Sequence, residues 1–268
     1  MQTSMSQAAS AMDRGPRFEL GGRVAIVTGG GSGMGAASAA ALAAYGARVA
    51  ILDVSEAGAN EVASRIGPSA RAYHCDVSDE KQVATCIASI RKELGPVDIV
   101  HNNAAVNMGY GAGDQRAGEL SAEVWRKNMG VNLDGTFFVT KYSIPDMLVA
   151  KRGSIINTAS LAGAFLGSQN TAYCSTKGGV VGFTRALVIS YAGTGIRANA
   201  ICPGFVTTPM SAPVLQNPLD LERYASSIPV GRAGVPEDIG GLVVFLASDA
   251  SGYVNGAVIP MDGGTSLR

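Results

Sequence analysis

Charged side chains are scarce in this sequence, and neither sign predominates. There are 21 lysines and arginines and 21 aspartates and glutamates, together only 16% of the 268 residues. Binding to nucleic acid or to an anionic membrane surface needs a basic excess, so neither partner is expected. Because 47% of the residues are apolar, the chain has ample material for a large buried core.

Long apolar runs and clusters of metal ligands are also missing. No run reaches the length of about 18 residues that a membrane-spanning helix requires. The cysteines stand singly at Cys75, Cys86, Cys174 and Cys202, and neither they nor the two histidines have the spacing of metal ligands. We therefore expect no metal and no disulfide framework, and a cytoplasmic location in which thiols stay reduced.

The chain shows no internal division after its first residues. Residues 1–17 lack the apolar segment of a secretory signal and are expected to form a flexible tail. No Pro- or Ser-rich linker follows, so residues 18–268 are predicted to form one domain. The proline-containing stretch at about 207–233 is predicted to be a movable lid over a substrate.

Short β-branched runs alternate with helical patterns along this domain. Strands are predicted at residues 23–28, 48–53, 69–77, 96–101, 153–160, 197–202 and 257–261. The clearest helical patterns cover residues 36–45, 80–94, 125–148, 171–187 and 237–246. The alternation predicts an α/β fold of the Rossmann type, a doubly wound parallel sheet of about seven strands with helices on both faces.

A glycine-rich turn joins the first strand to the first helix. Its pattern, T-G-x-x-x-G-x-G from Thr28 to Gly35, differs from G-x-G-x-x-G, but the flanking strand and helix give it the same setting. Backbone N–H groups at such a turn can face a pyrophosphate. We therefore predict a dinucleotide site that includes Gly29, Ser32, Gly33, Met34 and Gly35.

Acidic residues end the second and third strands. Asp53 lies at the distance from the glycines where a carboxylate accepts hydrogen bonds from the adenosine ribose. It would repel a 2′-phosphate, and neither Gly30, Gly31 nor Val54 supplies a compensating cation, so NAD is predicted over NADP. Asp76, with the backbone of Val77, is expected to contact the adenine.

Tyr173 and Lys177 stand four residues apart in a predicted helix and therefore share a face. An ammonium within about 4–6 Å lowers the pKa of a phenol by roughly 1–3 units. The pair can thus serve as a proton-transfer group near neutral pH.

Taken together, these motifs resemble the short-chain dehydrogenase/reductase family, and the resemblance extends from Leu20 to the end of the chain. The order and spacing of several motifs match the family. These motifs are Thr28 to Gly35, Asp76, Asn102 to Ala105, Asn132, Ser160, Tyr173, Lys177, Pro203, Gly204 and Thr208. One residue departs from the family pattern, because Ala105 replaces the usual glycine of the Asn-Asn-Ala-Gly motif.

The resemblance implies four catalytic residues. Tyr173 would be the general acid and base, and Lys177 would lower its pKa and hold the nicotinamide ribose. Ser160 would donate a hydrogen bond to the substrate oxygen, and Asn132 would bend its helix and hold a water that relays the proton. The nicotinamide side of the cofactor site would include Asn103, Ala104, Pro203, Gly204, Val206 and Thr208.

The implied reaction interconverts a secondary alcohol and a ketone. The loops at 106–113, 162–170 and 209–221 supply mainly apolar side chains for the substrate, among them Met108, Tyr110, Phe165, Leu166, Met210, Val214 and Leu215, with Gln169 and Asn170 nearby. Two alternatives are a 3-oxoacyl-[acyl-carrier-protein] reductase and a non-catalytic dinucleotide-binding sensor. The resemblance also implies a homotetramer, with a dimer as the alternative.

Overall fold

The computed structural model describes residues 18–108, 115–215 and 218–268. Its strands are β1 (Val24–Thr28), β2 (Arg48–Asp53), β3 (Ala70–His74), β4 (Ile99–Asn102), β5 (Gly153–Thr158), β6 (Ile196–Pro203) and β7 (Val258–Met261). They form one parallel sheet in the order β3-β2-β1-β4-β5-β6-β7. The predicted Rossmann-type fold is therefore confirmed.

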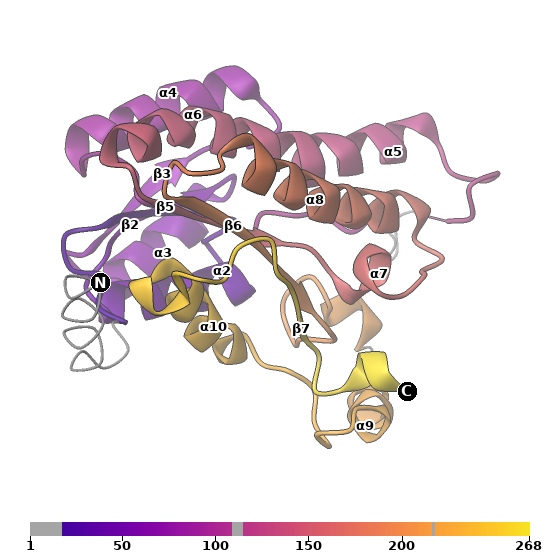
Figure 1. Ribbon diagram of the computed structural model, residues 1–268. Helices are drawn as coiled ribbons and strands as arrows, with labels where there is room; N and C mark the ends of the chain where they lie inside the picture. The colour runs from indigo at the N-terminus through magenta and orange to yellow at the C-terminus, as the bar shows by residue number, and fades with distance from the viewer. Residues whose placement is uncertain (1–17, 109–114, 216–217) are drawn as a thin grey trace, which may run out of the picture.

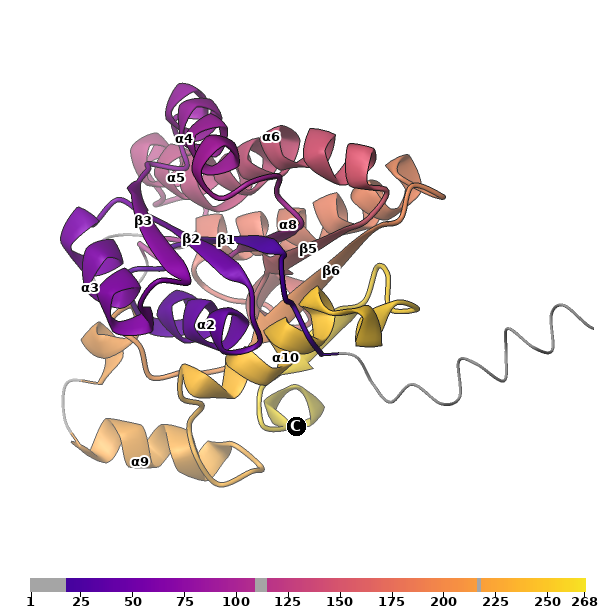
Figure 2. The same cartoon turned by 90° about the vertical axis from the view of Figure 1, so that its left-hand side faces the viewer.

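Helices cover the sheet on both sides (Figures 1 and 2). On one side lie α4 (Glu80–Glu93), α5 (Ala122–Asn128), α6 (Gly135–Ala150) and α8 (Thr171–Ser190). On the other lie α2 (Gly33–Ala44), α3 (Glu56–Ile66) and α10 (Glu237–Ala247). All five residues of β1 are buried, because a parallel strand between two helical layers has no solvent-facing side.

The two helical layers enclose separate apolar cores. Ile87, Val139 and Ile155 belong to the core on the α4 and α6 side, and Leu42, Ile51 and Val243 to the core on the α2 and α10 side. The strand order reverses between β1 and β4: from β1 the chain proceeds to β2 and β3 on one side, and from β4 it proceeds to β5, β6 and β7 on the other. In open α/β sheets this point, at the carboxyl ends of the strands, is where ligands bind.

The predicted helix over residues 125–148 is present and contains a π-helical stretch. That segment is α5, then a π-helical stretch, η1 (Met129–Asp134), and then α6. The other predicted elements are present with ends shifted by a few residues; α2 begins at Gly33 instead of residue 36, and β5 ends at Thr158, two residues before Ser160.

Shorter elements surround the carboxyl edge of the sheet. They are α7 (Leu161–Ala164), η2 (Ala212–Val214), α9 (Pro218–Ser227) and η4 (Thr265–Leu267). By contrast, η3 (Asp249–Ser251) lies at the opposite edge, where Asp249 pairs with Arg23 just before β1. In Figure 2, α9 stands away from the two helical layers. It lies in the segment predicted as a lid.

Candidate active site

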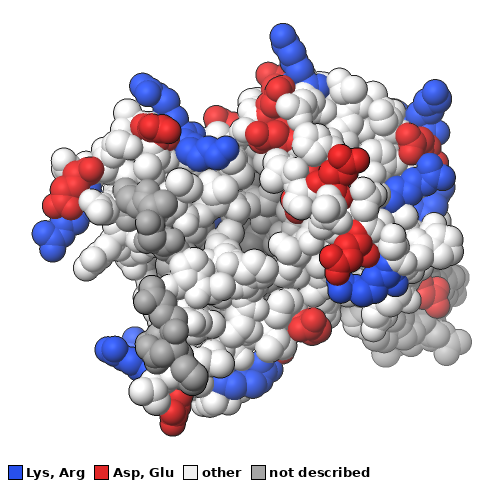
Figure 3. Space-filling model, turned by 180° about the vertical axis from the view of Figure 1, so that it is seen from behind, with Lys and Arg blue, Asp and Glu red and all other residues white. Residues whose placement is uncertain are grey.

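A cavity of about 550 Å³ lies at the carboxyl ends of the strands, where the order of the sheet reverses. It runs from the glycine turn and Asp53 to Tyr173 and the segment that follows β6. Among the residues that the structure describes, the charged ones that line it are Asp53, Asp76, Lys127 and Lys177. From behind, the surface is hollowed in its middle, and most Lys, Arg, Asp and Glu side chains lie toward the outline (Figure 3). The cavity is therefore suited to a ligand that is bound mainly through main chain and uncharged groups.

The glycine turn packs against the end of β4. The side-chain oxygen of Thr28 accepts hydrogen bonds from the backbone N–H groups of Asn103 and Ala104, at 3.0 Å each. Asn103 in turn donates from its amide to the carbonyl oxygens of Thr28 and Gly29, at 3.1 and 3.3 Å. These bonds fix the two strand ends as one unit beneath the cavity.

Two glycines of the turn have no room for a side chain. Gly29 has φ +60°, and a Cβ there would lie 2.8 Å from the Cα of Ala104. A Cβ on Gly35 would overlap the carbonyl oxygen of Gly29. Glycine is required because the turn must approach the neighbouring strand closely.

The start of α2 suits a phosphate group. Ser32 is its N-cap residue but makes no side-chain cap, and no acidic residue occupies the first turn. The first N–H groups of a helix lack intrahelical partners and carry partial positive charge. Ser32, Gly33 and Met34 all line the cavity, so an anionic pyrophosphate fits the donors at this end.

Asp53 and Asp76 lie at the other end of the predicted cofactor site. Asp53 accepts hydrogen bonds at 2.9 Å from the backbone N–H of Gly31 to one oxygen and of Ser55 to the other. Asp76 accepts from the N–H and hydroxyl of Ser78, at 2.9 and 2.6 Å. Partial burial opposes ionisation of Asp76, but these bonds prevail and lower its pKa. Both carboxylates therefore present acceptor oxygens in the cavity.

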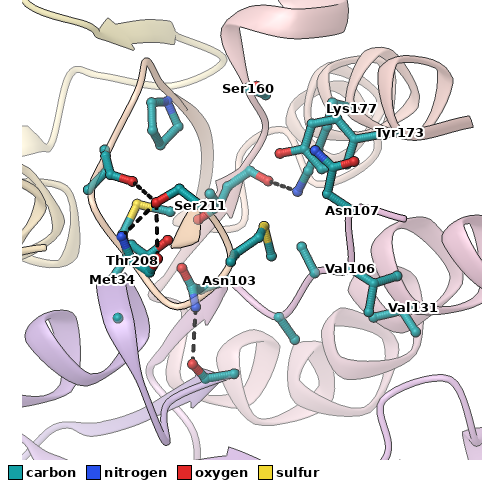
Figure 4. Close-up of a pocket in the computed structure, with 18 of the residues that line it drawn as sticks. Met34, Asn103, Val106, Asn107, Val131, Ser160, Tyr173, Lys177, Thr208 and Ser211 are labelled. Carbon is teal, nitrogen blue, oxygen red and sulfur yellow. Dashed lines mark hydrogen bonds between the residues drawn. The ribbon is translucent and has the colours of Figure 1, made fainter. Parts of the chain in front are cut away.

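Tyr173 and Lys177 share one wall, as the helical spacing predicts (Figure 4). The Lys177 Nζ lies 5.5 Å from the centre of the Tyr173 ring and donates to the carbonyl oxygen of Thr158 at 2.7 Å. Lys177 is only 2% exposed, and this burial lowers its pKa to about 8. Its position is thus fixed by β5, which contributes Thr158.

Ser160 lies on the same side of the cavity, just after β5 (Figure 4). Its hydroxyl oxygen accepts from the backbone N–H of Ala162 at 3.2 Å. A hydroxyl that accepts in this way can still donate its own proton. Capping of the next turn and a bond to a substrate oxygen are therefore compatible.

Asn132 is fully buried within the π-helical stretch. Its side chain accepts from the backbone N–H of Val106 at 2.8 Å and donates to the carbonyl of Val106 at 2.9 Å and to the hydroxyl of Thr176 at 3.1 Å. Both amide hydrogens are used, so Asn132 joins the loop after β4 to α8. π-Helical turns of this kind often occur at functional sites.

The segment after β6 lines the opposite side of the cavity. It contributes Pro203, Gly204, Val206 and Thr208, and an isolated bridge pairs Val206 with Gly234. The Ser211 hydroxyl donates to the carbonyl of Val206 and accepts from the N–H of Thr208, at 2.9 Å each (Figure 4). This turn fixes the main chain that was predicted to contact the nicotinamide.

The predicted substrate side chains are only partly correct. Leu166, Met210 and Asn170 line the cavity, whereas Met108, Phe165, Gln169 and Leu215 do not. A tight turn at Gly163, with φ +88°, closes through a bond from its N–H to the Leu166 carbonyl, and Phe165 is 48% exposed. Tyr110 lies outside the described residues, as does the side chain of Val214.

Sequence reasoning did not single out Asn107, Lys127, Phe205 or Ser211, which also line the cavity. The Phe205 ring stacks on that of Tyr224 in α9, with 4.3 Å between ring centres and 4° between planes. This contact joins distant parts of the chain, and no local pattern signals it.

Neither metal-binding clusters nor membrane spans occur in the described ranges. No group of three or more His, Cys, Asp or Glu residues is arranged to hold a metal ion within residues 18–108, 115–215 and 218–268. In that same part of the chain, every helix is too short or too polar to cross a bilayer.

Known proteins resemble this chain over nearly its full length. A family model described as enoyl-(acyl carrier protein) reductase matches residues 29–266. D-threitol dehydrogenase from Mycolicibacterium smegmatis is 38% identical over 94% of this chain and 95% of its own length. Meso-2,3-butanediol dehydrogenase from Serratia marcescens is 38% identical over 91% of this chain and 94% of its own length.

A solved structure shows the same fold at similar identity. It is described as a putative NAD(P)-dependent gluconate 5-dehydrogenase from Beutenbergia cavernae with bound NADP, and it superposes with a TM-score of 0.86. It is 38% identical and covers 95% of this chain and 100% of that chain. The sequence motifs, the sheet order and these similarities agree, and the chain belongs to the short-chain dehydrogenase/reductase family.

Proposed function

We propose that the protein interconverts a secondary alcohol and a ketone, with NAD as the hydride carrier and Tyr173 as the general acid and base. The observation that supports this most directly is the placement of Tyr173, Lys177 and Ser160 around one end of a cavity whose other end is the glycine turn. The relatives described above are named as dehydrogenases of alcohols, which is the same reaction class.

In the oxidative direction, the Tyr173 phenolate accepts the hydroxyl proton of the substrate. The Lys177 ammonium stabilises that phenolate, and the Thr158 carbonyl holds the ammonium in place at 2.7 Å. Because Lys177 is excluded from water, its charge acts in a medium of low dielectric constant. NAD, when bound, accepts the hydride from the carbinol carbon.

Ser160 donates to the substrate oxygen and steadies the negative charge that develops on it during hydride transfer. Asn132 holds the loop after β4 through Val106, and the water that relays the proton is placed beside the π-helical main chain. The side-chain amide hydrogens of Asn132 are already used by Val106 and Thr176, so a main-chain group is the better holder of that water.

The preference for NAD follows from the residues around Asp53. Its carboxylate would accept hydrogen bonds from the ribose hydroxyls and repel a 2′-phosphate, while the neighbouring Val54 offers no cation. Asp76 and Val77 would contact the adenine. The α2 N-terminus and the backbone from Gly29 to Gly35 would hold the pyrophosphate, and the segment from Pro203 to Thr208 would hold the carboxamide.

The segment 207–233 acts as a lid over the substrate. The stacked rings of Phe205 and Tyr224 connect α9 to the cavity wall, so that α9 moves with the residues that surround the substrate. Among the described lining residues, those near Tyr173 are mainly uncharged, which favours a neutral substrate.

A homotetramer is the proposed assembly, in the cytoplasm, where the four cysteines stay free. Large apolar side chains are exposed along α6 and α8, including Phe137 at 44% and Ile189 at 78%. A second copy would cover them. Gly182 has open space above its Cα for a close approach, whereas Gly179 already faces Leu133 of its own chain.

A spectrophotometric screen at 340 nm tests the function. Purified protein is assayed with secondary alcohols and ketones, each with NAD(H) and NADP(H). Acetoacetyl thioesters test the alternative of a 3-oxoacyl-[acyl-carrier-protein] reductase, the activity for which a 34% identical relative from Thermotoga maritima is named. We expect that the protein oxidises a secondary alcohol, and that turnover is faster with NAD than with NADP. Dinucleotide binding without turnover of any alcohol or ketone would favour the sensor alternative instead.

A further inference from the structure

Two neutral amides, Asn107 and Asn170, line the cavity on the side of Tyr173. Asn107 belongs to the loop after β4, and Asn170 immediately precedes α8. Their side chains meet across the cavity wall, with 3.3 Å between the Asn170 Nδ2 and the Asn107 Oδ1. This bond is long for an amide pair, and a ligand hydroxyl can exchange with it at small cost.

Asn170 does not perform the structural role that its position suggests. It is the N-cap residue of α8, where an asparagine side chain commonly accepts from the first N–H groups of the helix. Here it makes no side-chain cap and is directed to Asn107 instead. An N-cap asparagine that makes no cap bond does not stabilise the helix in the usual way, so its amide is available for another purpose.

Asn107 is held beside Tyr173 through the residue that precedes it. Asn132 binds both polar main-chain groups of Val106, the residue before Asn107, at 2.8 and 2.9 Å. Further along, the Thr171 hydroxyl donates to the Gln115 carbonyl at 2.7 Å and joins the loop to the start of α8. Figure 4 shows Asn107 and Tyr173 on the same side of the cavity. The amide is thus carried by a fixed framework.

The charges around the cavity restrict what the amides can bind. Asp53 and Asp76 lie at strand ends β2 and β3, and Lys127 acts on Asp76, so these three lie toward the adenine end. Among the described lining residues, Lys177 alone is charged beside Tyr173. A carboxamide both donates and accepts, so it can use both capacities with a hydroxyl group, whereas an anion would leave its oxygen unpaired.

We propose that the substrate is a vicinal diol, with the α-hydroxyketone as its product, and that Asn107 and Asn170 bind the second hydroxyl. This inference rests on the proposed function and extends it to a substrate class. Asn170 is the N-cap residue of α8 and Tyr173 is the third residue of that helix, so the two lie within one turn of each other and both line the cavity. One substrate oxygen can therefore reach Tyr173 and Ser160 while the oxygen on the adjacent carbon reaches the amides.

The reaction is a two-electron oxidation of one hydroxyl group of the diol. The carbinol C–H bond breaks and its hydride passes to NAD⁺, while the hydroxyl proton passes to Tyr173 and then to solvent. The C–O bond becomes a carbonyl, giving hydroxyketone, NADH and one proton. The second hydroxyl stays unchanged and serves only for recognition.

The test compares 2,3-butanediol with 2-butanol, which differ by the second hydroxyl. We expect the wild type to favour the diol in kcat/KM by about tenfold or more, the loss expected when polar groups of a site stay unpaired. In Asn107→Leu and Asn170→Leu this ratio is expected to fall at least about fivefold, mainly through the KM of the diol. Gln169→Leu is the matched control, because Gln169 is exposed and does not line the cavity, and its ratio should stay as in the wild type.

NADH binding, followed by fluorescence, shows separately that each variant is folded. Equal kcat/KM for the two alcohols in the wild type, or an unchanged ratio in both Leu variants, overturns the proposal while leaving the secondary-alcohol function intact. Turnover of neither alcohol nor of any other secondary alcohol or ketone in the screen contradicts the proposed function itself.

Discussion

At the ends of β1 and β2 the cavity is bounded by strand ends and turns that are joined through main-chain groups, whereas around Tyr173 it is lined from loops and from the start of α8. On the first side, Thr28 binds two N–H groups of the β4 end, and Asp53 binds the N–H of Gly31. On the second side, Asn107 and Asn170 lie on separate segments that are joined by a bond between their side chains, and Met210 lies on the segment after β6. The dinucleotide half is therefore determined by backbone geometry, and the substrate half by a small number of side chains.

This difference has consequences for substitution. In the dinucleotide half, most changes of side chain should matter only where a glycine excludes a Cβ or where a carboxylate selects the ribose. In the substrate half, single side chains should control proton transfer and specificity. The predictions that follow separate these two kinds of effect.

The largest effect is expected for Tyr173→Phe. The change removes the hydroxyl and keeps the ring beside Lys177, so turnover should fall by about 10²–10⁴, the usual contribution of a general acid or base. NADH affinity, measured by fluorescence titration, should change much less, because the glycine turn and Asp53 are untouched. A variant that turns over at nearly the parent rate would remove Tyr173 from the mechanism.

Lys177→Met should lower turnover by about 10² and change how stability depends on pH. Burial lowers the pKa of Lys177 to about 8, below its value of about 10.4 in an unfolded chain. Between these values the unfolded chain holds a proton that the folded chain has released, so stability contributed by this group rises with pH. Below pH 8 the folded protein bears the full penalty of the buried charge.

Chemical denaturation of the cofactor-free protein at pH 7 and pH 10 measures this effect. The quantity compared is the free energy of unfolding of Lys177→Met minus that of the wild type. It should be larger at pH 7 than at pH 10, by up to about 3 kcal/mol. The Met variant also loses the bond to the Thr158 carbonyl at both pH values, which offsets part of its gain. If the difference in free energy of unfolding between the two proteins does not vary with pH, the lowered pKa assigned to Lys177 is contradicted.

The same division between the two halves determines what sequence alone can predict. The sheet, its alternation with helices and the glycine turn follow from local patterns, as does the shared face of Tyr173 and Lys177. The turn at Gly163, which exposes Phe165 and brings Leu166 to the cavity, depends on bonds within a loop. The π-helical stretch at Asn132 and the stacking of Phe205 on Tyr224 depend on contacts between distant segments. Periodicity carries no signal for such contacts.

The smallest effect is expected where one side chain acts within the dinucleotide half. Asp53→Ala should reduce the preference for NAD over NADP by about tenfold, because it removes the charge that repels a 2′-phosphate and the acceptor of ribose hydrogen bonds. The loss of bonds to Gly31 and Ser55 also loosens the turn, which weakens both cofactors. Asp53→Asn separates the two causes, because an amide keeps the size and an acceptor oxygen but carries no charge.

Ratios of kcat/KM for NAD and NADP report the outcome, and Glu56→Ala serves as the control. Glu56 is an exposed carboxylate at the start of α3 that does not line the cavity, so its loss tests the general effect of removing one negative charge nearby. If the Asn and Ala variants both relax the ratio and Glu56→Ala does not, the Asp53 charge selects the cofactor. Another outcome is that Asp53→Ala weakens the binding of both cofactors and leaves the ratio of kcat/KM for NAD and NADP unchanged. Asp53 would then only support the turn, and the cofactor would be bound in this half of the cavity by the backbone, without a side chain that selects NAD.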